Sequence, residues 1–557
     1  MESHKQTSKM ATNYGALSTL ITVFFFWGFI ASGNGVFIPF CKDYFQLDQF
    51  QSQLVDFAFY GAYYIGALSL FVYSNWKQND LVSGWGYKKS IVFGLLFSLL
   101  GAIAMIISVE YGSKENGFTF FLISFFILAL GFSLQQTAAN PFAISLGDPS
   151  TGSHRVNLGG GINSFGTAIG PIIVALALFG ATHYDDSALQ NLSLNSVIGL
   201  YMGVGLLFLI AALLFAFSKK VPDGKGLSGF EPAPKAVWLL LSMTLGFIAC
   251  FVPVFNSYKI EWSESELQGV EFNRMLWLIG ALFILIAGLW ASFRWSQKKH
   301  QGWGALQYPQ LTLGMFAIFV YVGVEVTIQS NMGELLKSPE FGNMQTSAIT
   351  PFISMFWGSL MIGRWTGAIP VFKLEARTKK IMMILVPILA FAVVQIVNRI
   401  AGKDMSPLNA YILCVAVLIL AFFLAADKPA LTLILFSSLA MVCMLIGLLF
   451  SGMISIYAFL SGGLFCSVMW PCIFSLSIAG LGKYESQGAA FLIMMILGGA
   501  IIPPLQGKLA DLESIGIHQS YWLTVVCFAY LAFFGYIVKN LLKKQGIDYD
   551  GQIDARP

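Results

Sequence analysis

Two acidic side chains stand inside long apolar runs of the sequence. Asp56 and Glu325 each have mostly apolar neighbours. A carboxylate in hydrocarbon is costly unless it is protonated, paired or bound to an ion. Each is therefore a candidate group for binding and releasing a proton or a sodium ion. The alternatives stay open: Asp56 could be hydrated near the end of its run, and Glu325 could simply pair with Arg364.

Several amides and aromatic rings share these apolar runs. Amide hydrogen bonds and aromatic ring faces together recognise polyhydroxylated ligands, and polar groups in a span are costly unless they line a cavity. The candidate binding residues are Asn34, Gln135, Gln136, Asn140, Asn163 and Gln329, with Trp27 and Tyr60 as stacking surfaces and Asn331 nearby. The competing interpretation is hydrogen bonding between helices for the amides and plain packing for the rings.

Signatures of catalysis, of metal binding and of nucleotide binding are missing from the sequence. There is no His cluster, no pair of catalytic acids and no nucleophile motif, so we expect no enzyme, no catalytic or metal-binding residue and no cofactor beyond a coupling ion. The run Gly159–Gly161 has no following Lys-Ser or Lys-Thr. It therefore predicts close helix packing rather than a phosphate loop.

The composition identifies the environment of these groups. The 557 residues are 57% hydrophobic, 15% aromatic and only 11% charged, whereas a soluble domain carries about 25% charged residues. A soluble enzyme, a nucleic-acid-binding protein and a disordered chain are excluded. The chain is expected to be an all-α polytopic protein of the lipid bilayer.

Sixteen apolar runs are long enough to cross a bilayer, given that a span needs about 20 residues. They are 17–40, 54–73, 91–109, 118–146, 158–181, 197–217, 236–255, 275–295, 311–332, 349–372, 381–397, 408–425, 430–450, 454–481, 489–509 and 521–538. Because the number is even, both termini lie on one side. With the termini inside, 24 of the 32 Lys and Arg residues fall on the inner side, which predicts cytoplasmic termini in a bacterial plasma membrane.

Two stretches of the chain repeat with parallel topology. Residues 141–146 (PFAISL) match 471–476 (PCIFSL), and 166–171 (GTAIGP) match 498–503 (GGAIIP) at nearly the same offset. The offset exceeds that of a plain six-plus-six chain, which indicates two inserted hairpins. We therefore expect a six-helix bundle over 1–217, a first hairpin with its linkers over 218–308, and a second bundle over 309–557 with a hairpin at about 381–425.

An ordered set of short motifs resembles the fucose and glucose/galactose permease branch of the major facilitator superfamily. The matching stretches are 25–29 (FFWGF), 53–63 (QLVDFAFYGAY), 86–89 (GYKK), 136–142 (QTAANPF), 155–157 (RVN), 163–166 (NSFG), 321–325 (YVGVE), 357–364 (WGSLMIGR), 463–465 (GLF), 486–488 (SQG) and 498–503 (GGAIIP), with Asn34, Pro39 and Pro471. No single stretch is decisive, but their order is specific. The two inserted hairpins fall outside the resemblance.

This resemblance implies a sugar carrier that works by alternating access, with its site between two six-helix bundles. The sequence departs from the fucose-permease pattern at three places. Gly35 stands where the pattern has Asp, Gln136 where it has Glu, and Gly160 where it has Gln. Two carboxylates that could carry a proton are therefore absent, and the proton mechanism does not carry over unchanged.

The functional hypothesis is a secondary active transporter that imports a monosaccharide of the fucose, glucose or galactose type, coupled to a proton or a sodium ion. An uncoupled facilitative carrier is the first alternative, since Gly35 and Gln136 cannot titrate. A membrane sugar sensor is the second, although no soluble output domain is present. We expect a functional monomer that needs no nucleic acid.

Overall fold

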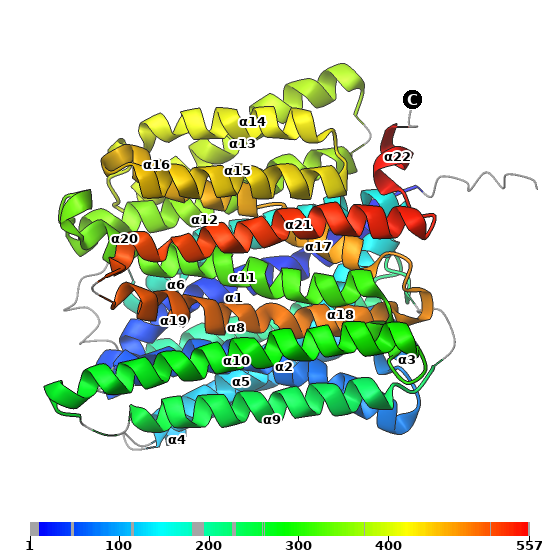
Figure 1. Cartoon of the computed structure of the whole chain (residues 1–557), viewed down its shortest axis with the longest axis horizontal. Coiled ribbons are helices and arrows are strands. Elements are labelled where there is room, and N and C mark those ends of the chain that lie inside the picture. The colour runs from blue at the N-terminus through cyan, green and yellow to red at the C-terminus, as the bar shows by residue number, and fades with distance from the viewer. Residues whose placement is uncertain are drawn as a thin grey trace, which may run out of the picture.

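The computed structural model describes residues 11–45, 49–112, 116–180, 194–224, 230–258, 260, 262–372, 374–512 and 514–554. In this part of the chain all regular secondary structure is helical. The helices run nearly side by side, and Figure 1 shows them as one stack of long rods.

The first half of the chain supplies six long helices. They are α1 (Tyr14–Phe45), α2 (Gln49–Lys77), α4 (Tyr87–Tyr111), α5 (Gly117–Ser145), α6 (Gly152–Phe179) and α8 (Leu194–Phe217), with the short α3 (Leu81–Trp85) after α2. Pro141 and Pro171 lie inside α5 and α6. Such prolines are tolerated in a helix bundle because neighbouring helices satisfy the freed backbone groups.

The second half repeats this arrangement with broken spans. Its helices are α11 (Pro309–Lys337), α12 (Thr346–Ala368), α15 (Pro429–Leu449), α16 (Gly452–Cys466), α17 (Met469–Ile478), α18 (Glu485–Met494), α19 (Gly498–Ala510) and α21 (Trp522–Lys544), with the short α20 (Gly516–Ser520) and α22 (Tyr549–Asp554). The predicted span 454–481 is divided between α16 and α17, and 489–509 between α18 and α19. A turn separates α16 from α17, and a 3-10 helix, Met495–Leu497, separates α18 from α19. Backbone that departs from the α-helix at such depth is stable only where protein buries it, and these segments are almost entirely buried.

The two inserted hairpins lie at opposite edges of the bundle (Figure 1). The first is formed by α9 (Pro234–Ser257) and α10 (Glu264–Lys298), and the second by α13 (Ala376–Ile400) and α14 (Ile412–Ala425). Both are peripheral, because only a third or so of their apolar windows is buried inside the protein. Their outward faces are as apolar as a lipid-facing helix must be.

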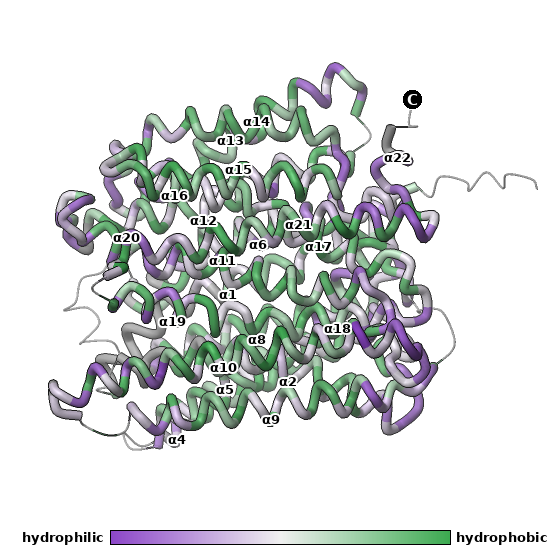
Figure 2. Tube along the Cα trace, in the orientation of Figure 1, coloured by the Kyte–Doolittle hydropathy of each residue, from purple (hydrophilic) through white to green (hydrophobic). Residues whose placement is uncertain are grey.

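The helices match the predicted spans. In the described residues, 14 helices are long and apolar enough to cross a membrane, and Tyr14–Ile30 is a shorter apolar helix. Each of the sixteen predicted runs falls on a helix or a broken pair of helices, α1 and α12 included. Figure 2 shows polar residues gathered at the two ends of the bundle with an apolar band between them. The all-α polytopic fold is therefore confirmed.

Arg155 organises one end of the bundle, which we call the inner end; it carries the α5–α6 turn at 146–151 and the C-terminal α22. The Arg155 guanidinium is buried and donates to the carbonyls of Ala143 at 2.7 Å, Ile144 at 2.5 Å and Asp148 at 2.9 Å. The last carbonyls of a helix have no partner within the helix. Arg155 therefore holds the end of α5 against the start of α6.

Candidate functional site

A buried ion pair joins two helices of the second half of the chain. Glu325 on α11 faces Arg364 on α12, with the carboxylate Oε1 3.3 Å from the guanidinium Nη2. The same guanidinium donates to the Tyr321 hydroxyl at 3.4 Å and to the Ser467 carbonyl at 3.3 Å. It also reaches across to the first half, where Nη1 donates to the Ser164 hydroxyl on α6 at 2.8 Å. One cation thus connects a buried acid with the opposite bundle.

Glycines on α6 make this contact possible. A Cβ on Gly160 would lie 3.3 Å from the Arg364 side chain, and one on Gly161 would lie 2.8 Å from the Trp365 ring. The Trp365 indole N–H donates to the Gly161 carbonyl at 3.0 Å. A larger side chain at either position would push α12 away from α6. The prediction that this glycine run serves close helix packing is confirmed.

Three of the predicted amides lie on the neighbouring helices α5 and α6. Gln136 donates from Nε2 to the Tyr63 hydroxyl at 3.1 Å, and Asn140 donates to the Gln136 carbonyl at 3.0 Å. Asn163 donates to the Phe24 carbonyl at 3.1 Å. The Asn140 Oδ1 atom is buried and accepts no hydrogen bond from the described residues. A buried acceptor without a donor costs about 1–3 kcal/mol, so this atom is suited to a hydroxyl donor on a ligand.

Two other predicted residues are bonded within the first bundle. The Trp27 indole donates to Gln135 Oε1 at 3.0 Å, and Gln135 Nε2 donates to the Ser98 hydroxyl at 3.0 Å. Gln135 is fully buried. These two hydrogen bonds connect α1 to α5 and α5 to α4, so the indole N–H and the Gln135 amide serve helix packing. Only the ring face of Trp27 is left for another partner.

The second half places its predicted residues in another group. Gln329 lies one turn from Glu325 on α11, a spacing that puts both on the same side of the helix. Asn331 donates to Gln506 Oε1 on α19 at 3.2 Å, and the Thr327 hydroxyl donates to the same atom at 2.9 Å. Gln506 is fully buried. It is not among the residues predicted from the sequence, although an amide inside an apolar run could have indicated it.

Tyr60 lies where the two halves meet. A Cβ on Gly499 of α19 would be 3.6 Å from Cε1 of the Tyr60 ring on α2. This ring therefore belongs to the seam between α2 and α19. The side chains of Asn34 and Asp56 lie outside the described residues, so their predicted roles stay predictions.

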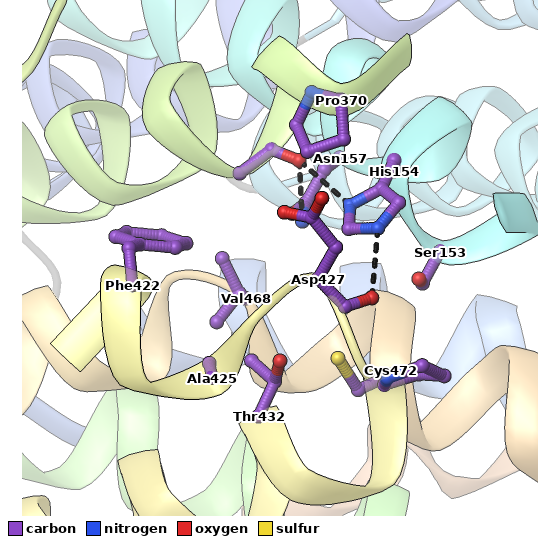
Figure 3. Close-up of a pocket in the computed structure, with 12 residues that line it drawn as sticks. Ser153, His154, Asn157, Pro370, Phe422, Ala425, Asp427, Thr432, Val468 and Cys472 are labelled. Carbon is purple, nitrogen blue, oxygen red and sulfur yellow. Dashed lines mark hydrogen bonds between the residues drawn. The ribbon is translucent and has the colours of Figure 1, made fainter. Parts of the chain in front are cut away.

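At the inner end, α6 of the first half contacts α12 and the α14–α15 turn of the second half through His154 (Figure 3). His154 on α6 contacts the Gly367 carbonyl through Nδ1 and the Asp427 carbonyl, in the α14–α15 turn, through Nε2, each at 3.1 Å. A neutral imidazole has one N–H, so it can donate to only one of these carbonyls. Beside the ring, the described residues offer no hydrogen-bond partner to Ser153 Oγ or Asn157 Oδ1.

The comparisons with known proteins agree with this architecture. No protein-family model matches the chain. The glucose/galactose transporter of Brucella abortus biovar 1 (strain 9-941) is 29% identical over 535 residues, covering 96% of each chain. The L-fucose-proton symporter of Escherichia coli K12 is 24% identical over 516 residues, covering 92% of this chain and 91% of the relative. The crystal structure of the major facilitator transporter FucP, in the outward conformation, superposes with a TM-score of 0.61 at 21% identity, covering 94% of this chain and 98% of that one.

The chain has the fold of the major facilitator superfamily, and it is similar over nearly its whole length to transporters named for glucose/galactose and for L-fucose. The relatives are named as transporters, which confirms the expectation that the chain is not an enzyme. The expected division into six-helix bundles over 1–217 and 309–557 stays a prediction, and "bundle" below means the half of the chain so bounded. Arg364 and His154 are contacts between the bundles, and any transport cycle must break or rearrange such contacts.

Proposed function

We propose that this permease imports a monosaccharide of the fucose, glucose or galactose type by alternating access, driven by an ion that binds at Glu325. The relatives named for these sugars support the substrate class. One observation carries the coupling: the buried Glu325–Arg364 pair is bonded to Ser164 of the opposite bundle. A charge pair in this position links the ionisation state of one acid to the contact between the bundles.

The departures from the family pattern favour Glu325 as the coupling group. Gly35 and Gln136 stand where the pattern has acids, and neither can take up a proton. Gly160 stands where the pattern has Gln, and the aliphatic part of Arg364 packs against it. The second bundle thus supplies a charged pair, whereas the first bundle lacks the two carboxylates of the family pattern.

The proposed cycle follows from electrostatics. With Glu325 ionised, Arg364 is held by the carboxylate and by Ser164 together. When a proton binds to the carboxylate, the attraction between the pair falls, and the guanidinium keeps only neutral acceptors. The contact across the bundles then weakens, so protonation and bundle separation favour each other. The proton-symporter relative supports a proton as the ion, while a sodium ion would instead bind the ionised carboxylate.

Sugar binding is proposed at the amides of α5 and α6. Asn163→Ala and Asn140→Ala are each expected to weaken binding about five- to hundredfold, because one lost hydrogen bond to a buried sugar costs roughly 1–3 kcal/mol. Binding of a panel of hexoses and 6-deoxyhexoses by isothermal titration measures this. Gln395→Ala is the control, since Gln395 is a buried amide of the second hairpin, remote from α5. Unchanged affinity in both folded variants would contradict the site assignment.

An uncoupled carrier is the second candidate, because Glu325 already has a cationic partner and could serve only to satisfy Arg364. Uptake into proteoliposomes separates the two functions. Counterflow exchange with the sugar panel should succeed in both cases. Accumulation above the external concentration under an imposed proton or sodium gradient occurs only with coupling.

The inner end of the bundle is proposed to face the cytoplasm of a bacterial plasma membrane, with both termini there, as the excess of basic residues favours. In a background with the native cysteines replaced, Lys298→Cys at the inner end and Asn343→Cys at the opposite end test this; both positions are exposed. A membrane-impermeant maleimide should label Asn343→Cys on intact cells. Lys298→Cys should react only after permeabilisation, and its labelling on intact cells would reverse the orientation.

A further inference from the structure

The first inserted hairpin covers the seam between the two bundles on the side of α2 and α19. On the first bundle, the hydroxyls of Tyr64 and Thr244 lie 2.9 Å apart, joining α2 to α9. The Phe57 ring packs edge-on against Phe251 and Phe255 of α9, with centroids 5.4 and 4.8 Å away. The hairpin is therefore anchored to α2 through α9.

The other helix of the hairpin is anchored to the second bundle. Lys508 on α19 forms an ion pair with Glu271 on α10, and Glu271 also pairs with Arg274 at 2.5 Å. Within the hairpin, Gly246 lies against Ile284 and Gly288 against Met243, so α9 and α10 are packed closely. The hairpin thus connects bundles that must move relative to each other during alternating access.

The inner end of this hairpin is basic and rich in exposed tryptophan. We call this surface the inner-end patch; it consists of Lys235, Trp238, Trp290, Arg294, Trp295, Lys298 and Lys299 of the hairpin and Tyr73, Trp76 and Lys77 of α2. Trp76 and Trp238 are each 71% exposed, Trp290 63% and Trp295 56%. The Lys77 ammonium lies 4.5 Å from the Trp76 ring centre, and the Arg294 guanidinium 5.7 Å from that of Trp290.

Neutralising acids are missing around the patch. The stretches 73–77, 235–238 and 290–300 contain no Asp or Glu. Nearby Glu231 is engaged by Lys483 at 2.9 Å and by the Tyr484 hydroxyl, and these partners hold its pKa below the usual range. Asp80 accepts hydrogen bonds from Ser83 and Ser486. In the described part of the chain, Lys77, Arg294, Lys298 and Lys299 form no ion pair with an acid.

The second hairpin provides the contrast. Its inner end is also basic, with Arg377, Lys379 and Lys380, but Lys379 is paired with Asp427. No tryptophan occurs in α13 or α14. The combination of uncompensated cations with exposed indoles is specific to the first hairpin, and a general excess of inside charge does not account for it.

We propose that the inner-end patch binds the headgroups of anionic phospholipids. Exposed indoles prefer the headgroup level of a bilayer, and Lys and Arg clusters beside them attract the lipid phosphodiester. The patch lies at this level, because α9 and α10 leave the apolar band there (Figure 2). A soluble acidic partner would not need indoles at the depth of the lipid headgroups. That this is the cytoplasmic leaflet rests on the proposed function; the binding itself does not.

The position of the patch gives the bound lipid a consequence. Because α9 is fixed to α2 and α10 to α19, a lipid held between Lys77 of α2 and the basic end of α10 joins the two bundles at the inner end. Anionic lipid should therefore favour the state in which the inner end is closed.

Lipid binding is tested with the full-length protein in nanodiscs of phosphatidylcholine, with and without phosphatidylglycerol. Native mass spectrometry counts the retained lipid without any sugar present. Lys298→Gln/Lys299→Gln should weaken phosphatidylglycerol retention about thirtyfold, since each basic residue near an anionic surface contributes about fivefold. Arg377→Gln/Lys380→Gln, which removes the same charge from the second hairpin, should leave it unchanged.

The opposing results are distinct. Equal loss in both double variants, or no preference of the wild type for phosphatidylglycerol, would overturn the proposal. If inorganic phosphate added to phosphatidylcholine nanodiscs occupies the patch equally well, the site is an anion site and the lipid assignment fails. Trp238→Ala/Trp290→Ala keeps the charge and should also weaken retention; full retention there would contradict headgroup binding. A protein that retains the lipid yet carries no sugar would refute the proposed function alone.

Discussion

Glu325→Gln is expected to abolish sugar accumulation against a gradient while sparing equilibrium exchange. The amide has the shape of the protonated acid and cannot release a proton, so the binding step that couples ion to sugar is lost. Arg364 would then be held by Ser164 and by neutral acceptors only. The variant should behave as a facilitative carrier whose sugar site still opens alternately to the two sides of the membrane.

The size of this effect is set by the gradient. With one proton per sugar, about two pH units across the vesicle membrane sustain about hundredfold accumulation, since each unit corresponds to about 1.4 kcal/mol. Proteoliposome uptake under that gradient should fall in the variant to the external concentration. A sodium gradient is run in parallel to identify the ion.

Glu334→Gln is the matched control, because it makes the same change on the same helix. Glu334 pairs with Lys337 at 2.8 Å, and both side chains are about half exposed or more, so accumulation should persist. If Glu325→Gln and Asp56→Asn both leave accumulation intact, the coupling assignment is wrong. If the wild type never accumulates sugar under either gradient, the uncoupled carrier takes its place.

The fold was predictable because it depends on local composition. Each apolar run had the length of a bilayer crossing, which can be recognised without any tertiary contact. The excess of Lys and Arg in alternate loops predicts the side on which the termini lie, and this stays a prediction. What the sequence did not reveal was the break between α16 and α17 at Ser467 and Val468. The break is stable because neighbouring helices bury it, and local hydropathy does not indicate such burial.

The site was predictable only in part, for a related reason. An acid and a base within spans must find partners, so Glu325 and Arg364 were recognisable as a pair. The partner of Arg364 across the seam, Ser164, is 200 residues away in sequence and is a common residue in any span. Which amides face a ligand and which, like Gln135, are consumed by helix packing depends on rotations of helices that periodicity does not specify in a uniformly apolar bundle.

The same reasoning explains why the hairpins could be located but not interpreted. Their existence followed from the excess length between the repeats. The attachment of the first hairpin to both bundles rests on Tyr64 with Thr244 and on Lys508 with Glu271. The types of these residues do not indicate such contacts, which depend on the side of the protein on which the hairpin packs.

Arg364→Met is expected to be the most damaging single substitution. It would leave Glu325 buried without its cation, and breaking a buried ion pair by removing one partner costs about 3–5 kcal/mol. The same change would remove the hydrogen bond to Ser164 that joins the bundles. We expect a markedly lower melting temperature in detergent. Lys379→Met breaks the partly exposed pair with Asp427 and should cost about 1 kcal/mol or less.

The double variant Glu325→Gln/Arg364→Met separates a structural from a coupling role. Removing both charges leaves no uncompensated ion, so the double variant should recover most of the stability lost in Arg364→Met. Coupled accumulation should nevertheless remain absent, because no group at the site can then bind the ion. Recovery of both stability and accumulation would mean that the pair only holds the bundles together and that the ion binds elsewhere.

Arg364→Lys keeps the charge but loses the planar guanidinium that reaches Glu325 and Ser164 together. This variant should preserve folding while slowing sugar exchange.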